Sequence, residues 1–193
     1  LIKLIGFSIP SNAADDKHFV IYSKYIPNKT LKDVVKNDET INKNNRKLTP
    51  TRRSKIVYAI ASSMNYLHQM KIVHRDLKPE NIFLDENYLP ILSDFGISRF
   101  YSDDVKMTTH LGTPYFMAPE LFEDDDITNK IDVYSFGITL LYMFTTDLRF
   151  KGAQPKTCYM IHKYLKNNKR LIIPKDVPEY YSSLIKRCWS QNP

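Results

Sequence analysis

The sequence predicts an α+β fold that is mainly helical, with a small antiparallel sheet near its start. Short apolar runs at residues 1–9 and 18–26 are separated by a Pro-Ser-Asn turn and acidic residues, which is typical of a strand, a turn and a second strand. Residues 50–70 carry apolar side chains every three or four positions, as an amphipathic helix does. Residues 131–145 are apolar nearly all round, which predicts a helix buried at the centre of the domain.

The other elements follow from the same kinds of pattern. Residues 30–36 combine a capping Thr with apolar residues at helical spacing and predict a short helix. The polar stretch 37–47 is rich in Asn and Lys and predicts a solvated loop. Thr49 and Pro50 suit the N-cap and first position of the long helix. We expect short strands in small hairpins at residues 72–73, 82–84 and 90–92. Two amphipathic helices are expected at residues 156–166 and 178–189.

Length and composition bound the class of protein. The 193 residues suit one domain. Lys and Arg outnumber Asp and Glu by 28 to 21, and the resulting charge of +7 favours anionic partners without choosing among nucleotides, nucleic acids and lipids. The two cysteines, Cys158 and Cys188, cannot build a disulfide framework and lie at no metal-binding spacing, which indicates a reducing, cytoplasmic setting.

Neither a membrane span nor a signal peptide is expected. The longest apolar stretch is shorter than the roughly 20 residues that a span needs, and it contains Asp132. The first ten residues lack a charged leader and begin with Leu, so we expect the chain to be a fragment.

The segment HRDLKPEN, residues 74–81, carries the strongest chemical signal. A hydroxyl nucleophile needs a proton acceptor, a γ-phosphate needs a cation, and Mg²⁺ needs oxygen ligands. Asp76, Lys78 and Asn81 could supply these in turn, on a loop that Pro79 keeps from becoming a helix. Asp94, in an Asp-Phe-Gly sequence, would be a second metal ligand, and Gly96 allows the chain to turn sharply after it.

These motifs resemble those of eukaryotic protein kinases. The order 74–81, then Asp-Phe-Gly at 94–96, then Ala-Pro-Glu at 118–120, is far more specific than any one of them. The resemblance implies a protein kinase fold: a helical C-lobe (27–193, incomplete at its end) preceded by the last two N-lobe strands and the hinge (1–26).

The resemblance also implies the roles of the central residues and the use of ATP and Mg²⁺. Asp76 would be the base or would position the substrate hydroxyl, and Lys78 would stabilise the transferring phosphoryl group. Asn81 and Asp94 would hold magnesium on ATP. Thr113 resembles the threonine that hydrogen-bonds the catalytic Asp and Lys in serine/threonine kinases.

The resemblance extends to the adenine pocket. Phe83 would form the floor under adenine, and Ser23 would stand at the back of the pocket. Lys24, Tyr25 and Ile26 would form the linker whose backbone binds the adenine edge, although an ordinary strand end remains an alternative there.

A hydrophobic column and a regulatory segment are implied in the same way. His74 and Phe95 would belong to the column, Leu4 would extend it and Asp132 would anchor it. Residues 97–117 correspond to the activation segment, in which Ser102, Thr108 and Thr109 are candidate phosphosites. Arg75, beside the catalytic Asp, could pair with an added phosphate.

The expected acceptor is a Ser or Thr hydroxyl of a protein substrate, because tyrosine kinases usually replace Lys78 and reshape residues 112–114. Residues 132–138 and 187–189 resemble the tyrosine-kinase-like branch, which also phosphorylates Ser and Thr; dual specificity stays open. The acidic run 123–126 hints at basic targets, although an exposed acidic loop is the commoner explanation.

The chain also departs from the family pattern. It contains no G-x-G-x-x-G, and the strand lysine and helix glutamate of the small lobe are missing from its 193 residues. We therefore expect this chain alone to be weakly active or inactive, with the activity belonging to its parent domain. The arginine that usually pairs with the Ala-Pro-Glu glutamate is also missing, so Glu120 is expected to lack that partner.

Two other functions are compatible with parts of the sequence. The first is a catalytically inactive, pseudokinase-like binding or scaffold module, against which the intact catalytic loop argues. The second is nucleic-acid binding, suggested by the charge and by residues 36–47, but no zinc, RNA-binding or helix-turn-helix signature supports it.

Overall fold

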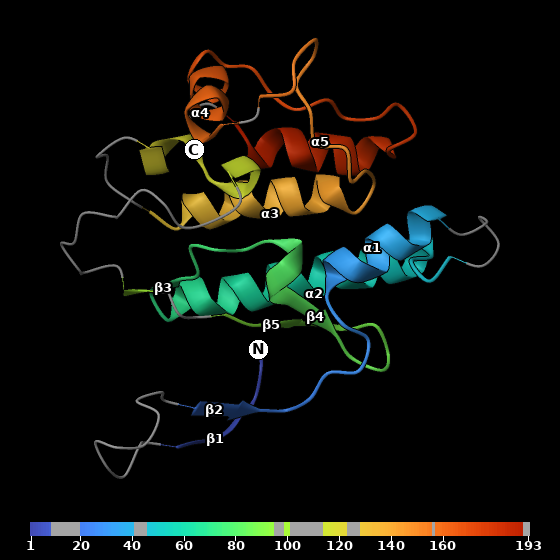
Figure 1. The fold of residues 1–193 in the computed structure, drawn as a ribbon, viewed down its shortest axis with the longest axis vertical. Helices are drawn as coiled ribbons and strands as arrows, with labels where there is room; N and C mark the ends of the chain where they lie inside the picture. Colours follow the sequence, from blue (N-terminus) through green and yellow to red (C-terminus); the bar gives the residue numbers. More distant parts are fainter. Residues whose placement is uncertain are drawn as a thin grey trace.

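The computed structural model describes residues 1–8, 20–40, 46–94, 99–100, 114–122, 128–155 and 157–190. Helix α3 lies in the middle of the molecule, with α4 and α5 on one side and α2 on the other (Figure 1). The β1–β2 hairpin lies at the far end, beyond β4 and β5. The elements, in chain order, are β1 (Leu4–Ser8), β2 (Val20–Ser23), α1 (Leu31–Thr40), α2 (Pro50–Gln69), β3 (Ile72–Val73), η2 (Pro79–Asn81), β4 (Ile82–Leu84), β5 (Pro90–Leu92), β6 (Arg99–Phe100), η3 (Pro114–Phe116), η4 (Pro119–Phe122), α3 (Lys130–Tyr142), α4 (Cys158–Lys166) and α5 (Glu179–Cys188).

The mainly helical α+β prediction is confirmed. Helix α2 begins at Pro50, and the hydroxyl of Thr49 caps it by accepting a hydrogen bond from the Arg52 N–H at 3.3 Å. Its buried residues are Ile56, Ile60, Met64 and Leu67, which recur at the predicted helical spacing.

Helix α3 forms the centre of the core, as its apolar composition predicts. Ile131, Ile138 and Leu141 are at most 1% exposed. Gly137 lets α5 approach closely, because a Cβ at this position would lie 2.6 Å from the Cβ of Cys188. Both cysteines are free thiols, as expected, and burial raises the pKa of Cys188 to about 11.

Helix α1 is longer than predicted, and the prediction of a loop from residue 37 is wrong for residues 37–40. Asp38 is 3% exposed, and its carboxylate accepts hydrogen bonds from the Lys47 N–H at 2.8 Å and the Leu48 N–H at 2.6 Å. The polar side chain is therefore buried because it binds the returning backbone, which a hydropathy pattern does not reveal.

The small sheets are two-stranded and antiparallel. β1 pairs with β2, and β4 pairs with β5 in the order Ile82↔Leu92, Phe83↔Ile91 and Leu84↔Pro90. The predicted strand at residues 72–73 pairs with β6, a partner that the sequence did not indicate. Within the described residues, no helix is both long and apolar enough to cross a membrane.

Candidate active site

The catalytic-loop side chains converge on one carboxylate. Asp76 Oδ2 accepts hydrogen bonds from Lys78 Nζ at 2.6 Å and from Asn81 Nδ2 at 2.8 Å. Asn81 Nδ2 also donates to the backbone oxygen of Asp76 at 2.9 Å. The side chains of Lys78 and Asp76 are only 16% and 14% exposed, so the attraction between them is screened less than that of a surface pair.

Local backbone geometry produces this convergence. Arg75 has φ +70, in the left-handed region, so the chain turns sharply immediately before Asp76. Lys78 is extended, and Pro79 then starts the short turn η2 that ends at Asn81. This turn brings Asn81 back to Asp76, which lies five positions earlier in the sequence.

His74 is fully buried and holds the backbone of Asp76 by a hydrogen bond. Its Nδ1 accepts the Asp76 N–H at 3.3 Å, and its Nε2 lies 3.1 Å from the backbone oxygen of Ser93. Because Nδ1 accepts, Nε2 carries the proton and donates to Ser93, which makes the ring neutral. Burial lowers the pKa of His74, and this also favours the neutral ring.

Asp132 anchors the catalytic loop to α3. Its carboxylate accepts the N–H groups of His74 and Arg75 at 2.8 and 2.9 Å, and it lies 2.9 Å from His68 Nε2. The contact of His68 with Asp132 was not predicted from the sequence. The sequence feature that could have indicated His68 is its position directly after Leu67 and four residues after Met64, beside the buried face of α2.

Hydrogen bonds between Ser93 and Asn81 bring the backbone before Asp94 to the catalytic loop. The N–H and hydroxyl of Ser93 both donate to the backbone oxygen of Asn81, at 2.9 and 3.0 Å. Asp94 follows directly, with φ +62 and an exposed side chain. The Asn81 amide oxygen and the Asp94 carboxylate are hard donors, so these two residues suit Mg²⁺.

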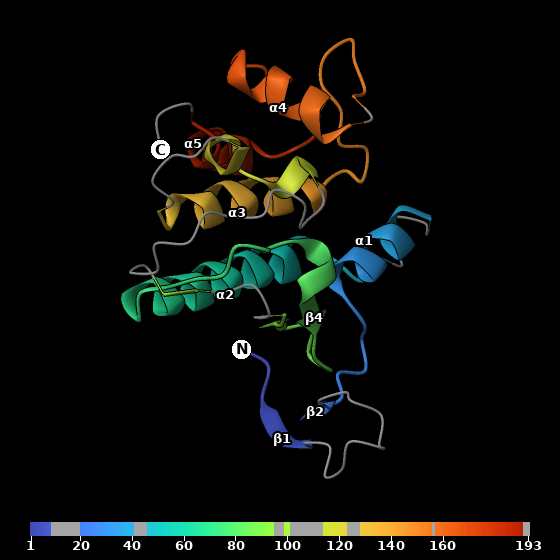
Figure 2. The ribbon, with the colours of Figure 1, turned by 60° about the vertical axis from the view of Figure 1, so that its left-hand side comes forward.

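The predicted adenine-pocket residues lie on β2, on the segment that follows it and on β4. Ser23 ends β2, and the Lys24 N–H donates to the Lys3 oxygen at 3.2 Å. Ile26 is buried, whereas Tyr25 is 82% exposed. Phe83 lies on β4, half-buried, and β4 lies between α2 and the hairpin (Figure 2).

The surroundings of Leu4 and Glu120 differ from those expected. Leu4 is 59% exposed, so it does not pack into a hydrophobic column, and in the described residues β2 is the strand that pairs with β1. Arg170 acts electrostatically on Glu120, so a cation other than the missing family arginine acts on this carboxylate. Burial lowers the pKa of Arg170, and the charges of Tyr134 and Glu120 oppose that effect.

An ion pair at the loop was also missed. Lys32 Nζ on α1 lies 2.7 Å from Glu80 Oε1 on η2. These residues are 48 positions apart, and no periodicity links them. Several predicted residues lie outside the described part of the chain: Phe95, Gly96, Ser102, Thr108, Thr109, Thr113 and the acidic run 123–126.

Comparisons with known proteins point to one family. A profile of the protein kinase domain matches residues 2–193. RGS domain-containing serine/threonine-protein kinase A of Dictyostelium discoideum is 37% identical over 93% of this chain and 15% of its own length. Mitogen-activated protein kinase kinase kinase 12 of Rattus norvegicus is 32% identical over 77% of this chain and 16% of its own length. Mitogen-activated protein kinase kinase kinase 13 of Homo sapiens is 34% identical over 77% of this chain and 15% of its own length.

The chain thus spans about a sixth of the length of these relatives. Because the profile covers nearly the whole chain and the first of these relatives is 37% identical over 93% of it, the chain belongs to the protein kinase family.

Proposed function

We propose that this chain is part of an ATP-dependent protein serine/threonine kinase. The observation that carries the proposal is the convergence of Lys78 and Asn81 on the Asp76 carboxylate, with Asp94 directly after Ser93, which hydrogen-bonds to the backbone of Asn81. The names of the relatives as serine/threonine-protein kinases support the same function.

Asp76 accepts the proton of the substrate hydroxyl, or orients that hydroxyl, as the γ-phosphoryl group is transferred. Lys78 lies against the same carboxylate, so its ammonium group stands where negative charge develops on the transferring group. The presence of a lysine at position 78 also supports a Ser or Thr acceptor, because tyrosine kinases usually replace this residue. Thr113 is proposed to hydrogen-bond this pair.

Members of this family generally use ATP with Mg²⁺. Here Asn81 and Asp94 would hold the ion, which offsets phosphate charge when bound. Ser23, Lys24, Tyr25, Ile26 and Phe83 would surround adenine.

The proposed division of the chain follows the same reasoning. Residues 1–26 would supply N-lobe strands and the hinge, and residues 27–193 the helical C-lobe. A cytoplasmic location is proposed for the parent protein, and subcellular fractionation would test it.

The test is transfer of radiolabelled phosphate from ATP to a Ser/Thr peptide by the parent protein. Asp76→Asn keeps the shape of the side chain but removes the base, so transfer should fall about 10²- to 10⁴-fold. Asp85→Asn is the matched control, because in the described residues the Asp85 carboxylate accepts its hydrogen bonds from N–H groups of its own turn.

Equal transfer by the wild type and Asp76→Asn would refute the role of Asp76. No transfer by either, with nucleotide binding intact, would instead favour the inactive binding module.

A further inference from the structure

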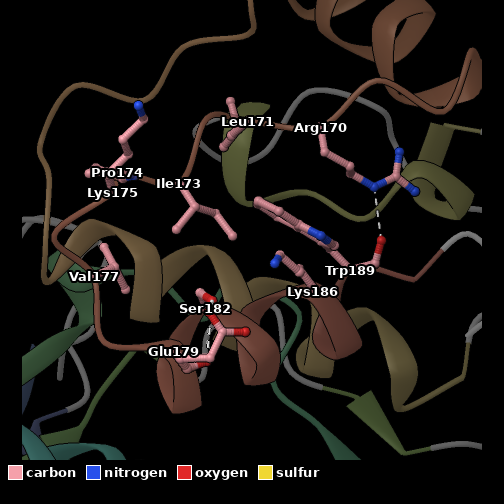
Figure 3. A pocket seen from close by; sticks show the side chains of 10 residues that line it. All are labelled: Arg170, Leu171, Ile173, Pro174, Lys175, Val177, Glu179, Ser182, Lys186 and Trp189. Carbon is pink, nitrogen blue, oxygen red and sulfur yellow. Dashed lines mark hydrogen bonds between the residues drawn. The ribbon is translucent and has the colours of Figure 1, made fainter.

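A cleft of about 510 Å³ lies between α5 and the segment that connects α4 to α5. Figure 3 shows Leu171, Ile173 and Val177 of the connection on one side, and Ser182, Lys186 and Trp189 on the other. Helix α3 separates α5 from the catalytic loop, so the cleft is remote from the proposed site of phosphoryl transfer (Figure 1). Its volume is typical of pockets that accept a ligand.

The apolar part of the cleft is already formed. Leu171, Val177 and Trp189 are 5%, 7% and 6% exposed. Arg170 Nε donates to the backbone oxygen of Trp189 at 2.8 Å and fixes the end of α5 against the connection. A side chain entering the cleft therefore meets an ordered apolar surface, so little ordering cost opposes binding.

The polar rim of the cleft is positively charged. Lys175 and Lys186 line it and are exposed, and in the described part of the chain neither forms an ion pair. Glu179 is the one carboxylate among the lining residues, and its oxygens accept hydrogen bonds from Ser182 and Ser183 at 3.2 and 3.0 Å. Asp176 does not line the cleft; it acts electrostatically on Arg53 of α2.

We propose that this cleft docks a short acidic segment of a partner protein, with one apolar side chain against Trp189 and carboxylates against Lys175 and Lys186. Complementary charge favours such a segment over a basic one. This site goes beyond phosphoryl transfer, because it would hold a partner without contacting the catalytic loop.

Trp189 makes the proposal directly measurable, because it is the only tryptophan of the chain. The probe is an acetylated Asp-Asp-Leu-Phe-Glu-Glu peptide, compared with its Lys-Lys-Leu-Phe-Arg-Arg counterpart. We expect the acidic peptide to change Trp fluorescence saturably, to bind more weakly as salt is raised, and to bind about tenfold or more tightly than the basic one.

A double charge reversal, Lys175→Glu with Lys186→Glu, should weaken binding of the acidic peptide about tenfold or more. The matched control, Lys36→Glu with Lys130→Glu, makes the same charge change at exposed lysines outside the cleft. Lys175→Gln with Lys186→Gln should give an intermediate loss, and circular dichroism verifies folding.

Three outcomes would overturn the proposal: equal binding of both peptides, unchanged affinity in the double reversal, or an equal loss in the control. Binding of anionic lipid vesicles with no response to the acidic peptide would also overturn it.

Discussion

The β1–β2 hairpin and the helical body bury their apolar side chains to very different degrees. Ile5, Phe7 and Ile21 of the hairpin are 68%, 67% and 72% exposed, whereas Ile138 of α3 is fully buried. The hairpin is tied to β5 by a backbone hydrogen bond from the Ile2 N–H to the Leu92 oxygen at 2.8 Å.

This difference in burial matters because the catalytic loop is held in place by residues of the helical body. Asp132 on α3 and Ser93 beside β5 hold His74, and His74 holds the backbone of Asp76. All four residues belong to the body. Damage to the core should therefore unfold the catalytic loop, whereas damage to the hairpin should leave it in place.

Truncating one isoleucine in each region should give the largest contrast. Ile138→Ala leaves a cavity in a fully buried site and should lower the free energy of unfolding by about 2–5 kcal/mol. Ile21→Ala should change it by less than about 0.5 kcal/mol, because the side chain is mostly exposed. Urea unfolding measures both. Similar losses would show that the hairpin packs against the body.

Replacing one glycine in each region tests the same difference between the body and the hairpin. Gly137→Ala places its Cβ 2.6 Å from that of Cys188 and should cost about 1–3 kcal/mol by forcing α3 and α5 apart. Gly6→Ala meets nothing within 4 Å and should be nearly neutral or slightly stabilising. Thermal unfolding compares the two; a stable Gly137→Ala variant would contradict the close approach of α3 and α5.

A smaller effect concerns pH. Burial lowers the pKa of His74 below its usual 6.5, so near this pH the unfolded chain takes up a proton that the folded chain does not. The free energy of unfolding should therefore fall as the pH drops below about 6.5, and this contribution should be constant above it. His74→Leu should remove this component of the slope. Identical slopes in the two proteins between about pH 5 and 6.5 would rule it out.

The sequence predicted most of the helices, because α2 and α3 carry periodicities that match their burial. It placed Asp76, Lys78 and Asn81 on one loop, and a segment of six residues can bring such side chains together by local turns. It did not predict the burial of Asp38, the Lys32–Glu80 pair or the pairing of β3 with β6. These depend on contacts between distant segments, which leave no periodic pattern.

The exposure of Leu4 was missed for a related reason. An apolar residue on a short strand is usually buried, but burial requires a neighbouring element, and in the described residues β2 is the strand that pairs with β1.

Manganese binding by the parent protein tests most directly whether Asn81 and Asp94 share one metal-nucleotide. Mn²⁺ replaces Mg²⁺ as a spectroscopic probe, and electron paramagnetic resonance measures its affinity with ADP present. Asn81→Ala and Asp94→Ala should each weaken Mn²⁺ binding about tenfold or more, while Asp85→Asn should leave it unchanged. Wild-type affinity in both alanine variants would contradict the account.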